Sequence, residues 1–151
     1  MSHLQRLAEL GLTLPPVAAP VAAYVPAVRT GNLVFTSGQL PFVDGALPRT
    51  GRVGAEVSAE DAQADARQCA LNALAAVDAE VGLDNVVRVV KLVGFVASAA
   101  GFTGQPGVVN GASDLLGDAF GEAGQHARSA VGVAELPLGA PVEVELIVEV
   151  A

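Results

Sequence analysis

The sequence predicts an α+β fold in which two helices pack on a single β-sheet. Between Ser58 and Gly82, apolar residues recur every three or four positions, which is the spacing of a helix with one buried face. The segment 142–150 instead alternates apolar and polar residues, which is typical of a strand. The predicted elements follow one another as strand, strand, helix, strand, helix, strand and strand. This order favours a layer of two helices on one sheet.

The N-terminal part of the chain predicts a short helix, an extended segment and two short strands. The helix is expected at Ser2–Leu10, where leucines recur at helical spacing, and Gly11 ends it. The segment Leu12–Pro26 contains four prolines, so we expect it to lie extended across the surface. Short apolar runs bounded by glycines predict strands at Asn32–Ser37 and Gln39–Val43.

The two main helices have boundaries that can be recognised in the sequence. Ser58 is expected to cap the first helix, with Asp61 as its capping-box partner, and Gly82 follows its last residue. The apolar face of this helix carries mainly small side chains, so it is expected to lie close to a sheet. Cys69 belongs to this face, and we interpret it as buried packing rather than as a nucleophile. The second helix is expected between residues 106 and 121, because it begins with proline and is followed by glycine.

The strand expected at Val86–Ser98 carries valines at both alternating positions. This pattern predicts that both faces of the strand are covered. Two charged residues, Arg88 and Lys91, interrupt the pattern and are expected to lie on opposite faces of the strand.

The stretch His126–Glu149 predicts two closing strands and the candidate site. Arg128 opens the first strand and Glu143 lies near the start of the second, with a Leu-Pro-Leu-Gly-Ala-Pro turn between them. The residues that share the alternation of Arg128 are all small: Ala130, Gly132 and Ala134. A single cation on a face without large side chains is typical of a receptor for an anion. If the two strands pair, the guanidinium and the carboxylate can share one pocket.

Composition and charge predict one domain of a soluble cytoplasmic protein. The chain has 151 residues, and its net charge of −8 with eight scattered basic residues argues against a duplex nucleic-acid binder. The single cysteine fits a reducing cytoplasm, and neither a signal peptide nor a membrane-spanning stretch is predicted. Because 52% of residues are hydrophobic and only 16% are charged, we expect apolar surface to be buried between subunits of a homo-oligomer.

Several reactive sites are not expected. Two histidines and one cysteine are too few for a multi-ligand His/Cys metal centre, so no metal is predicted. The glycine-rich stretch Gly101–Gly111 lacks the spacing of a dinucleotide-binding loop. Ser129 lies near His126, which suggests a nucleophile and its base. Since no third orienting group is visible, we interpret Ser129 as a structural residue of a strand.

Two groups of motifs in this sequence resemble the RidA (YjgF) family, in particular a longer branch of it. The C-terminal group consists of Ala127-Arg128-Ser129, Leu136-Pro137 and Val142-Glu143-Val144-Glu145. The N-terminal group consists of Tyr24-Val25, Gly31-Asn32 and Thr36-Ser37-Gly38-Gln39. Asn110 stands, within one residue, where the family carries an asparagine ahead of its second helix. The resemblance makes residues 24–151 the family-like domain and residues 1–23 an N-terminal extension.

The resemblance implies a chorismate-mutase-like α+β fold, with two main helices on one face of a mixed sheet, assembled as a homotrimer with pockets between subunits. Enzymes of the family hydrolyse reactive enamines and imines to 2-keto acids and ammonia without a cofactor. Carried over to this sequence, Arg128 binds the substrate carboxylate and Glu143 orients or activates the attacking water.

The resemblance also implies which residues line the pocket, namely Tyr24, Ser37, Asn110 and Ala130. Ala130 departs from the family, since many members carry a cysteine there. His126 departs as well, since many members carry a proline, and we expect it to be a solvated loop histidine. The longer segment before Tyr24 is expected to narrow or redirect the pocket.

Three other interpretations of the same residues stay open. The chain could be a non-catalytic trimer that binds small carboxylates through Arg128. A ribonuclease or translation inhibitor is disfavoured, because the chain is acidic and lacks a basic patch. Finally, Arg128 and Glu143 could form an ion pair that only holds two strands or two subunits together.

Overall fold

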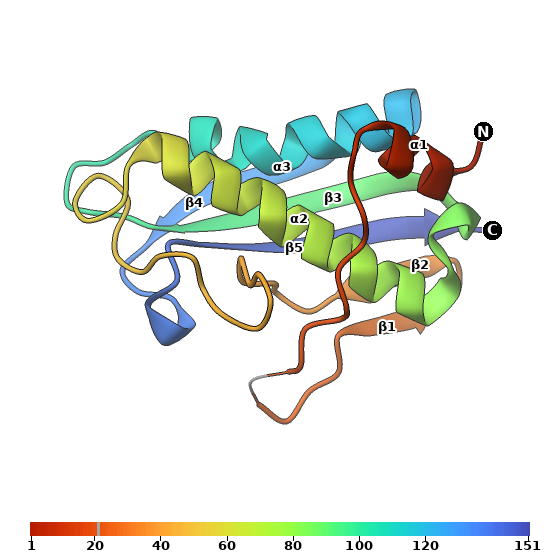
Figure 1. Ribbon diagram of the computed structural model, residues 1–151, viewed down its shortest axis with the longest axis horizontal. Coiled ribbons are helices and arrows are strands. Elements are labelled where there is room, and N and C mark those ends of the chain that lie inside the picture. Colours follow the sequence, from red (N-terminus) through yellow and green to blue (C-terminus); the bar gives the residue numbers. More distant parts are fainter. Residues whose placement is uncertain (21) are drawn as a thin grey trace.

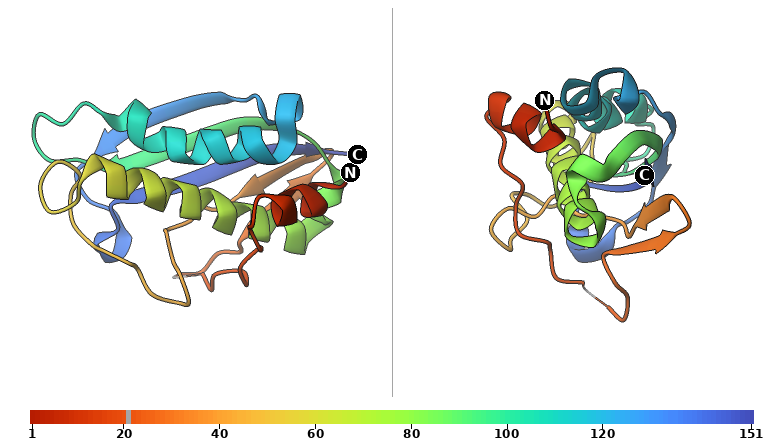
Figure 2. Two further views of the ribbon diagram at one scale, coloured as in Figure 1. Left: turned by 45° about the horizontal axis from the view of Figure 1, so that its top comes forward. Right: turned by 90° about the vertical axis from the view of Figure 1, so that its right-hand side faces the viewer.

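Five strands form one mixed sheet, and the two long helices cover one of its faces (Figure 1). The structure is a computed structural model that describes residues 1–20 and 22–151; Val21, inside the predicted extended segment, lies outside the described residues. The strands are β1 (Ala27–Thr30), β2 (Leu33–Thr36), β3 (Val86–Ala97), β4 (Ala127–Val133) and β5 (Val142–Val150). The α-helices are α1 (His3–Glu9), α2 (Ala59–Val81) and α3 (Gln105–Phe120), and the 3-10 turns are η1 (Leu83–Asn85), η2 (Gly121–Gly124) and η3 (Pro137–Gly139). The predicted α+β class is confirmed, and Figure 2 shows the helices and the sheet from two further directions.

The strand order in the sheet is β1-β2-β5-β3-β4. β3 and β4 run parallel, whereas the other neighbouring strands are antiparallel. The chain passes from β3 to β4 through α3, which makes a βαβ crossover. Because β3 lies between β4 and β5, the two closing strands do not pair, and the condition for a pocket shared between these two strands is not met.

β1 and β2 form a hairpin whose turn consists of Gly31 and Asn32. Gly31 adopts a φ of 57°, a left-handed conformation that glycine tolerates without strain. The strand predicted at Asn32–Ser37 corresponds to β2, while β1 lies upstream of any strand that the sequence analysis predicts.

The second strand expected near the N-terminus, at Gln39–Val43, is wrong. Two isolated bridges form there instead, one from Gln39 to Val144 and one from Val43 to Ala46. Pro41 has no N–H group to donate to a neighbouring strand. The buried Asn72 of α2 instead donates hydrogen bonds of 2.9 and 3.1 Å to the carbonyl oxygens on either side of this proline. These bonds tie the segment to the helix layer.

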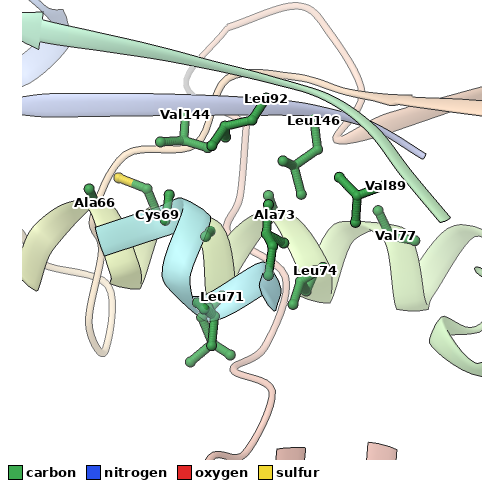
Figure 3. Close-up of a cluster of buried hydrophobic side chains, with 14 of the residues drawn as sticks. Ala66, Cys69, Leu71, Ala73, Leu74, Val77, Val89, Leu92, Val144 and Leu146 are labelled. Carbon is green, nitrogen blue, oxygen red and sulfur yellow. The ribbon is translucent and has the colours of Figure 1, made fainter. Parts of the chain in front are cut away.

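The core lies between α2, α3 and the sheet. Ser58 caps α2, since its hydroxyl accepts a hydrogen bond of 3.1 Å from the backbone N–H of Asp61. Figure 3 shows small and medium side chains of α2, among them Ala66, Cys69 and Ala73, facing the apolar sides of β3 and β5. Burial raises the pKa of the Cys69 thiol well above its usual value, so this residue is packing in the core.

The N-terminal residues form a further layer over the helices. Leu7 of α1 is buried, and the Arg6 side chain donates a hydrogen bond of 2.9 Å to the carbonyl oxygen of Asp118 in α3. Leu12 and Leu14 of the following extended segment pack against the core. Among the described residues, no helix is both long enough and apolar enough to cross a membrane.

The face of the sheet opposite the helices is open in the single chain. It carries a group of apolar side chains that are exposed or half-buried: Phe35, Val93, Phe95, Val131 and Ile147. The expectation that both faces of β3 are covered is therefore wrong for one copy. An apolar sheet face of this kind is typical of a surface that another chain covers.

The two charged residues of β3 lie on this same open face. Arg88 pairs with Glu149 and Lys91 pairs with Ile147, and these two partners are two positions apart in β5. The pairing shifts between Val89 and Lys91, where a bulge adds one residue to β3. The prediction of opposite faces is wrong because it assumes an unbroken alternation.

Gly111 allows α2 and α3 to approach each other. A Cβ atom at this position would lie 2.0 Å from the backbone oxygen of Gln63, whereas a Cβ atom at Gly117 of the same helix would meet nothing within 4 Å. We expect Gly111→Ala to lower the free energy of unfolding by about 1–3 kcal/mol, because α3 must move. Gly117→Ala is the matched control and should be neutral or stabilising by up to about 1 kcal/mol. Denaturant unfolding of both variants checks this, and equal effects would contradict the close contact.

Candidate functional site

Arg128 lies on the edge strand β4, and its side chain faces α3. The Nη1 atom donates to Asn110 Oδ1 at 2.8 Å and to Ser113 Oγ at 3.1 Å, and Nη2 donates to the carbonyl oxygen of Pro106 at 3.1 Å. The three α3 residues are spaced four and three apart, which places them on one face of the helix. The predicted neighbours Arg128 and Asn110 are thus in contact.

The small residues that accompany Arg128 on β4 make room for α3 rather than for a ligand. A Cβ atom at Gly132 would lie 2.8 Å from Nε2 of Gln105. Ala130 is half-buried and packs against the core. The first turns of α3 cover this face and supply the acceptors for Arg128.

The Arg128 guanidinium has no acidic partner within the part of the chain that the structure describes, residues 1–20 and 22–151. Every ion pair there joins other residues. Three N–H groups donate to the oxygens of α3, and the Nε–H and one Nη2–H have no acceptor in these residues. Such a pair of donors can hold the two oxygens of a carboxylate. An ion pair with Glu143 within one chain is therefore excluded.

His126 is not a solvated loop residue as expected, since both ring nitrogens have partners. The Nδ1 atom lies 2.6 Å from the carbonyl oxygen of Gly124, and Nε2 lies 2.9 Å from Ser113 Oγ. Ser129, which the sequence places near His126, lies instead on the exposed side of β4, opposite Val93. The structural role of Ser129 in the strand stays a prediction.

Glu143 lies in a second region, in a cavity of about 410 Å³ that we name the Glu143 pocket. Its other lining residues come from the extended N-terminal segment, the residues after β2 and the turn before β5: Ala18, Ala19, Pro20, Ala22, Tyr24, Pro26, Ser37, Gly38, Gln39, Leu40, Phe42 and Pro137. The predicted site residues Tyr24, Ser37 and Glu143 are brought together here. The Ser37 hydroxyl donates a hydrogen bond of 2.6 Å to the carbonyl oxygen of Val25, which fixes the wall beside Tyr24.

The environment of Glu143 favours its neutral form. Burial raises the pKa of this carboxyl, and repulsion by Glu145 raises it further. Within the described residues, no N–H or O–H group donates a hydrogen bond to it, and no cation pairs with it. A half-buried carboxyl with a raised pKa and no partner is typical of a group that exchanges protons with a ligand or water.

Gly38 permits the approach of Glu143 to the chain after β2. A Cβ atom at this position would lie 2.3 Å from Glu143 Oε1 and 2.8 Å from Cδ. Any larger residue there must therefore displace the carboxyl group. The backbone of this segment is held in turn by Gln39, which exchanges hydrogen bonds of 2.8 and 3.1 Å with Val144.

The two regions lie on opposite faces of the sheet. Arg128 pairs with Leu92, whose side chain is buried beneath the helices, and Glu143 pairs with Phe95 on the same strand. Leu92 and Phe95 are three positions apart in a regular part of β3, so they face opposite ways. The expectation that Arg128 and Glu143 share one pocket is wrong within a single chain.

Some residues of these two regions escape the sequence analysis. The sequence does carry a signal for Ser113, because this residue lies three positions after Asn110 and so shares its helix face. Gly38 is visible only as part of a polar corner, and nothing in the sequence shows that Glu143 lies against it. The contact between His126 and Ser113 depends on how η2 turns the chain, which no local pattern shows.

Comparison with known proteins identifies the family of this chain. Residues 16–150 match the family described as Endoribonuclease L-PSP. Protein TCP17 of Trypanosoma cruzi is 50% identical over 98% of this chain and 92% of its own length. The 2-iminobutanoate/2-iminopropanoate deaminase of Salmonella typhimurium is 40% identical over 85% of this chain and 88% of its own length. The crystal structure of Atu1372 from Agrobacterium tumefaciens, a protein of unknown function, matches with a TM-score of 0.91 at 49% identity, covering 99% of this chain and 92% of that one. The chain therefore belongs to the Endoribonuclease L-PSP family, which is the RidA (YjgF) family that its motifs resemble.

Proposed function

We propose that this protein hydrolyses reactive 2-imino acids and their enamine tautomers to 2-keto acids and ammonia. The observation that carries the proposal is the guanidinium of Arg128, which α3 holds in place and which has no acidic partner in the described chain. The relatives named 2-iminobutanoate/2-iminopropanoate deaminase support the choice of substrate class. The open donors of Arg128 bind the carboxylate that every 2-imino acid carries.

Glu143 acts on water in this proposal. The ionised carboxyl takes a proton from water as the water oxygen attacks the imine carbon, and a C–O bond forms while the C=N bond becomes single. The carboxyl returns the proton to the nitrogen, which gives a neutral carbinolamine. The carboxylate then takes the hydroxyl proton of the carbinolamine and passes it to the amino nitrogen, so that the C–N bond breaks, ammonia leaves and the C=O bond of the keto acid forms. One water is consumed, and no electrons are exchanged. An imine carbon is electrophilic without further activation, so the step needs no cofactor.

The complete site forms between two copies of the chain, because one copy presents its two charges on opposite faces of the sheet. We propose a homotrimer in which Arg128 and Asn110 of one copy meet the Glu143 pocket of the next. The apolar open face of the sheet supports this assembly, since Phe35, Phe95 and Ile147 would otherwise stay in contact with water. In this trimer, Arg128 and Glu143, which have no charged partner within their own chain, face each other across the interface between two copies.

The N-terminal extension, residues 1–23, sets the size of the substrate in this proposal. Ala18, Ala19 and Pro20 form one wall of the Glu143 pocket, and the cavity of about 410 Å³ is near the small end of the usual range for ligand sites. The small apolar wall suits the short side chains of small 2-imino acids.

The first test is a coupled assay in which a dehydratase generates 2-iminobutanoate from threonine and 2-iminopropanoate from serine. Release of the keto acid is followed with and without this protein. Acceleration supports hydrolysis. If the intact protein causes no acceleration but binds 2-oxobutanoate in calorimetry, the alternative of a non-catalytic trimer that binds small carboxylates replaces the proposal.

Gly38→Ala tests the placement of Glu143 without removing it. We expect kcat/KM in this assay to fall about 10–100-fold, because the new methyl group displaces the carboxyl from its position beside the substrate. Gly117→Ala, which meets nothing within 4 Å, is the control and should keep the activity of the parent. An active Gly38→Ala variant with an unchanged melting temperature would show that Glu143 does not need this position.

A further inference from the structure

We infer that His126 is a positioning residue for Arg128 and that it acts through the hydroxyl group of Ser113. The inference rests on the proposed role of Arg128 as the carboxylate-binding group. The residues form one chain of hydrogen bonds that links η2, α3 and β4: Arg128 to Ser113, Ser113 to His126, and His126 to Gly124.

The donor and the acceptor of each of these hydrogen bonds can be assigned by starting from the carbonyl oxygen of Gly124. The carbonyl oxygen of Gly124 can only accept, so His126 Nδ1, at 2.6 Å, carries a proton and donates it. In the neutral ring Nε2 is then an acceptor, and the Ser113 hydroxyl, at 2.9 Å, donates to it. The lone pairs of Ser113 Oγ are thereby left for Arg128 Nη1 at 3.1 Å.

His126 therefore fixes the orientation of the Ser113 hydroxyl group. A serine in a helix can also donate to the carbonyl oxygen four residues earlier, and a free hydroxyl rotates among several positions. Some of these positions point the hydroxyl hydrogen at the guanidinium and repel it. With the acceptor Nε2 in place, the hydroxyl points away from Arg128. Donation by Ser113 also polarises its oxygen, so that it accepts more strongly from the arginine.

The hydrogen bonds to α3 determine which edge of the Arg128 guanidinium is left to bind a ligand. Ser113 and Asn110 engage both hydrogens of Nη1, and Pro106 engages one hydrogen of Nη2. These bonds define the plane of the group and direct the remaining donors, Nε–H and one Nη2–H, away from α3. A planar fork must be aligned with the carboxylate to bind it at two points, so loss of one support weakens binding more than it alters the chemistry.

Two substitutions at position 126 separate this role from a local structural one. His126→Gln can place its side-chain oxygen where Nε2 lies, and so keeps the acceptor for Ser113. His126→Asn can place its amide nitrogen where Nδ1 lies, and so keeps the donor to Gly124. If His126 only anchors the turn at η2, the asparagine variant should behave like the parent. If His126 acts through Ser113, the glutamine variant should behave like the parent instead.

The kinetic test measures KM and kcat with 2-iminobutanoate and the Kd of 2-oxobutanoate for the parent and four variants. His126→Asn and Ser113→Ala are expected to raise KM and Kd about 2–10-fold, with kcat changed less than 2-fold. His126→Gln should stay within about 2-fold of the parent in all three. The double variant His126→Asn/Ser113→Ala should be no worse than Ser113→Ala alone, because both changes break the same chain. A normal asparagine variant with a weakened glutamine variant, or additive effects in the double variant, would overturn the inference.

A second readout does not depend on turnover. The Arg128 Nη1 hydrogens, assigned in an NMR spectrum by their loss in Arg128→Lys, should exchange with water several-fold faster in His126→Asn than in His126→Gln or the parent. Equal exchange in all three proteins would overturn the relay. If the exchange rates differ as expected while the parent neither hydrolyses 2-iminobutanoate nor binds 2-oxobutanoate, the relay stands and the proposed function fails.

Discussion

Arg128→Ala is expected to lower kcat/KM for 2-iminobutanoate by about two to four orders of magnitude. The guanidinium supplies two charge-assisted hydrogen bonds to the carboxylate in the proposed complex, and each is worth about 1.5–3 kcal/mol. Without these two hydrogen bonds, the substrate is also no longer held in position next to the attacking water. The coupled assay measures the loss directly, and calorimetry with 2-oxobutanoate should show a matching loss of affinity.

Two variants control this experiment. Arg67→Ala removes a half-buried arginine of α2 that pairs with Asp118 at 3.9 Å, and it should keep full activity. Arg128→Lys keeps the charge but not the planar fork, and it should recover only part of the loss. Full activity of Arg128→Ala would contradict the carboxylate role, and a loss of assembly with unchanged activity per trimer would indicate a structural role instead.

Glu143→Gln is expected to lower kcat by about two to four orders of magnitude, the usual range for a general base. Because the amide has almost the same shape as the carboxyl group, the Kd of 2-oxobutanoate should change less than about 3-fold. Single-turnover and steady-state rates in the coupled assay check the first expectation. A variant that loses binding but not kcat would assign Glu143 to substrate contact rather than to water.

The same substitution is expected to stabilise the fold at neutral pH. Burial and Glu145 raise the pKa of Glu143, so the folded protein holds this proton more tightly than the unfolded chain. Below the unfolded pKa of about 4.3 both states are protonated and the substitution brings no advantage. As the pH rises through the raised folded pKa, the parent loses stability relative to Glu143→Gln. Unfolding in an Arg128→Ala background, where no neighbouring guanidinium offsets the effect, measures this difference at pH 4 and pH 8. A gap that does not widen with pH would contradict the raised pKa.

Patterns of burial along single elements allow much of the fold to be predicted from the sequence. The alternation from Val142 to Val150 and the helical spacing after Ser58 each report which side of an element is buried, and the structure confirms both. The turn at Gly31 and Asn32 could also have predicted the hairpin of β1 and β2, since this dipeptide suits a two-residue turn.

The arrangement of the site could not be predicted in the same way. The sequence places Arg128 and Glu143 near the starts of successive strands, which suggests a shared pocket, but β3 inserts between these strands. Which strand occupies that position depends on long-range pairing through the α3 crossover and not on any local pattern. The same pairing turns Arg128 toward α3, where Asn110 and Ser113 meet it.

Arg128 of one copy and Glu143 of another form one site in the proposed trimer, and mixed trimers provide the test of this arrangement. Arg128→Ala and Glu143→Gln chains, each nearly inactive alone, are co-expressed in equal amounts and purified together as one unseparated mixture of assemblies. With random assembly at equal amounts, about one quarter of the sites receive Arg128 from one chain and Glu143 from its neighbour. We therefore expect the mixture to recover about one quarter of the parent activity. A mixture no more active than the separate variants would show that the two residues do not combine across subunits.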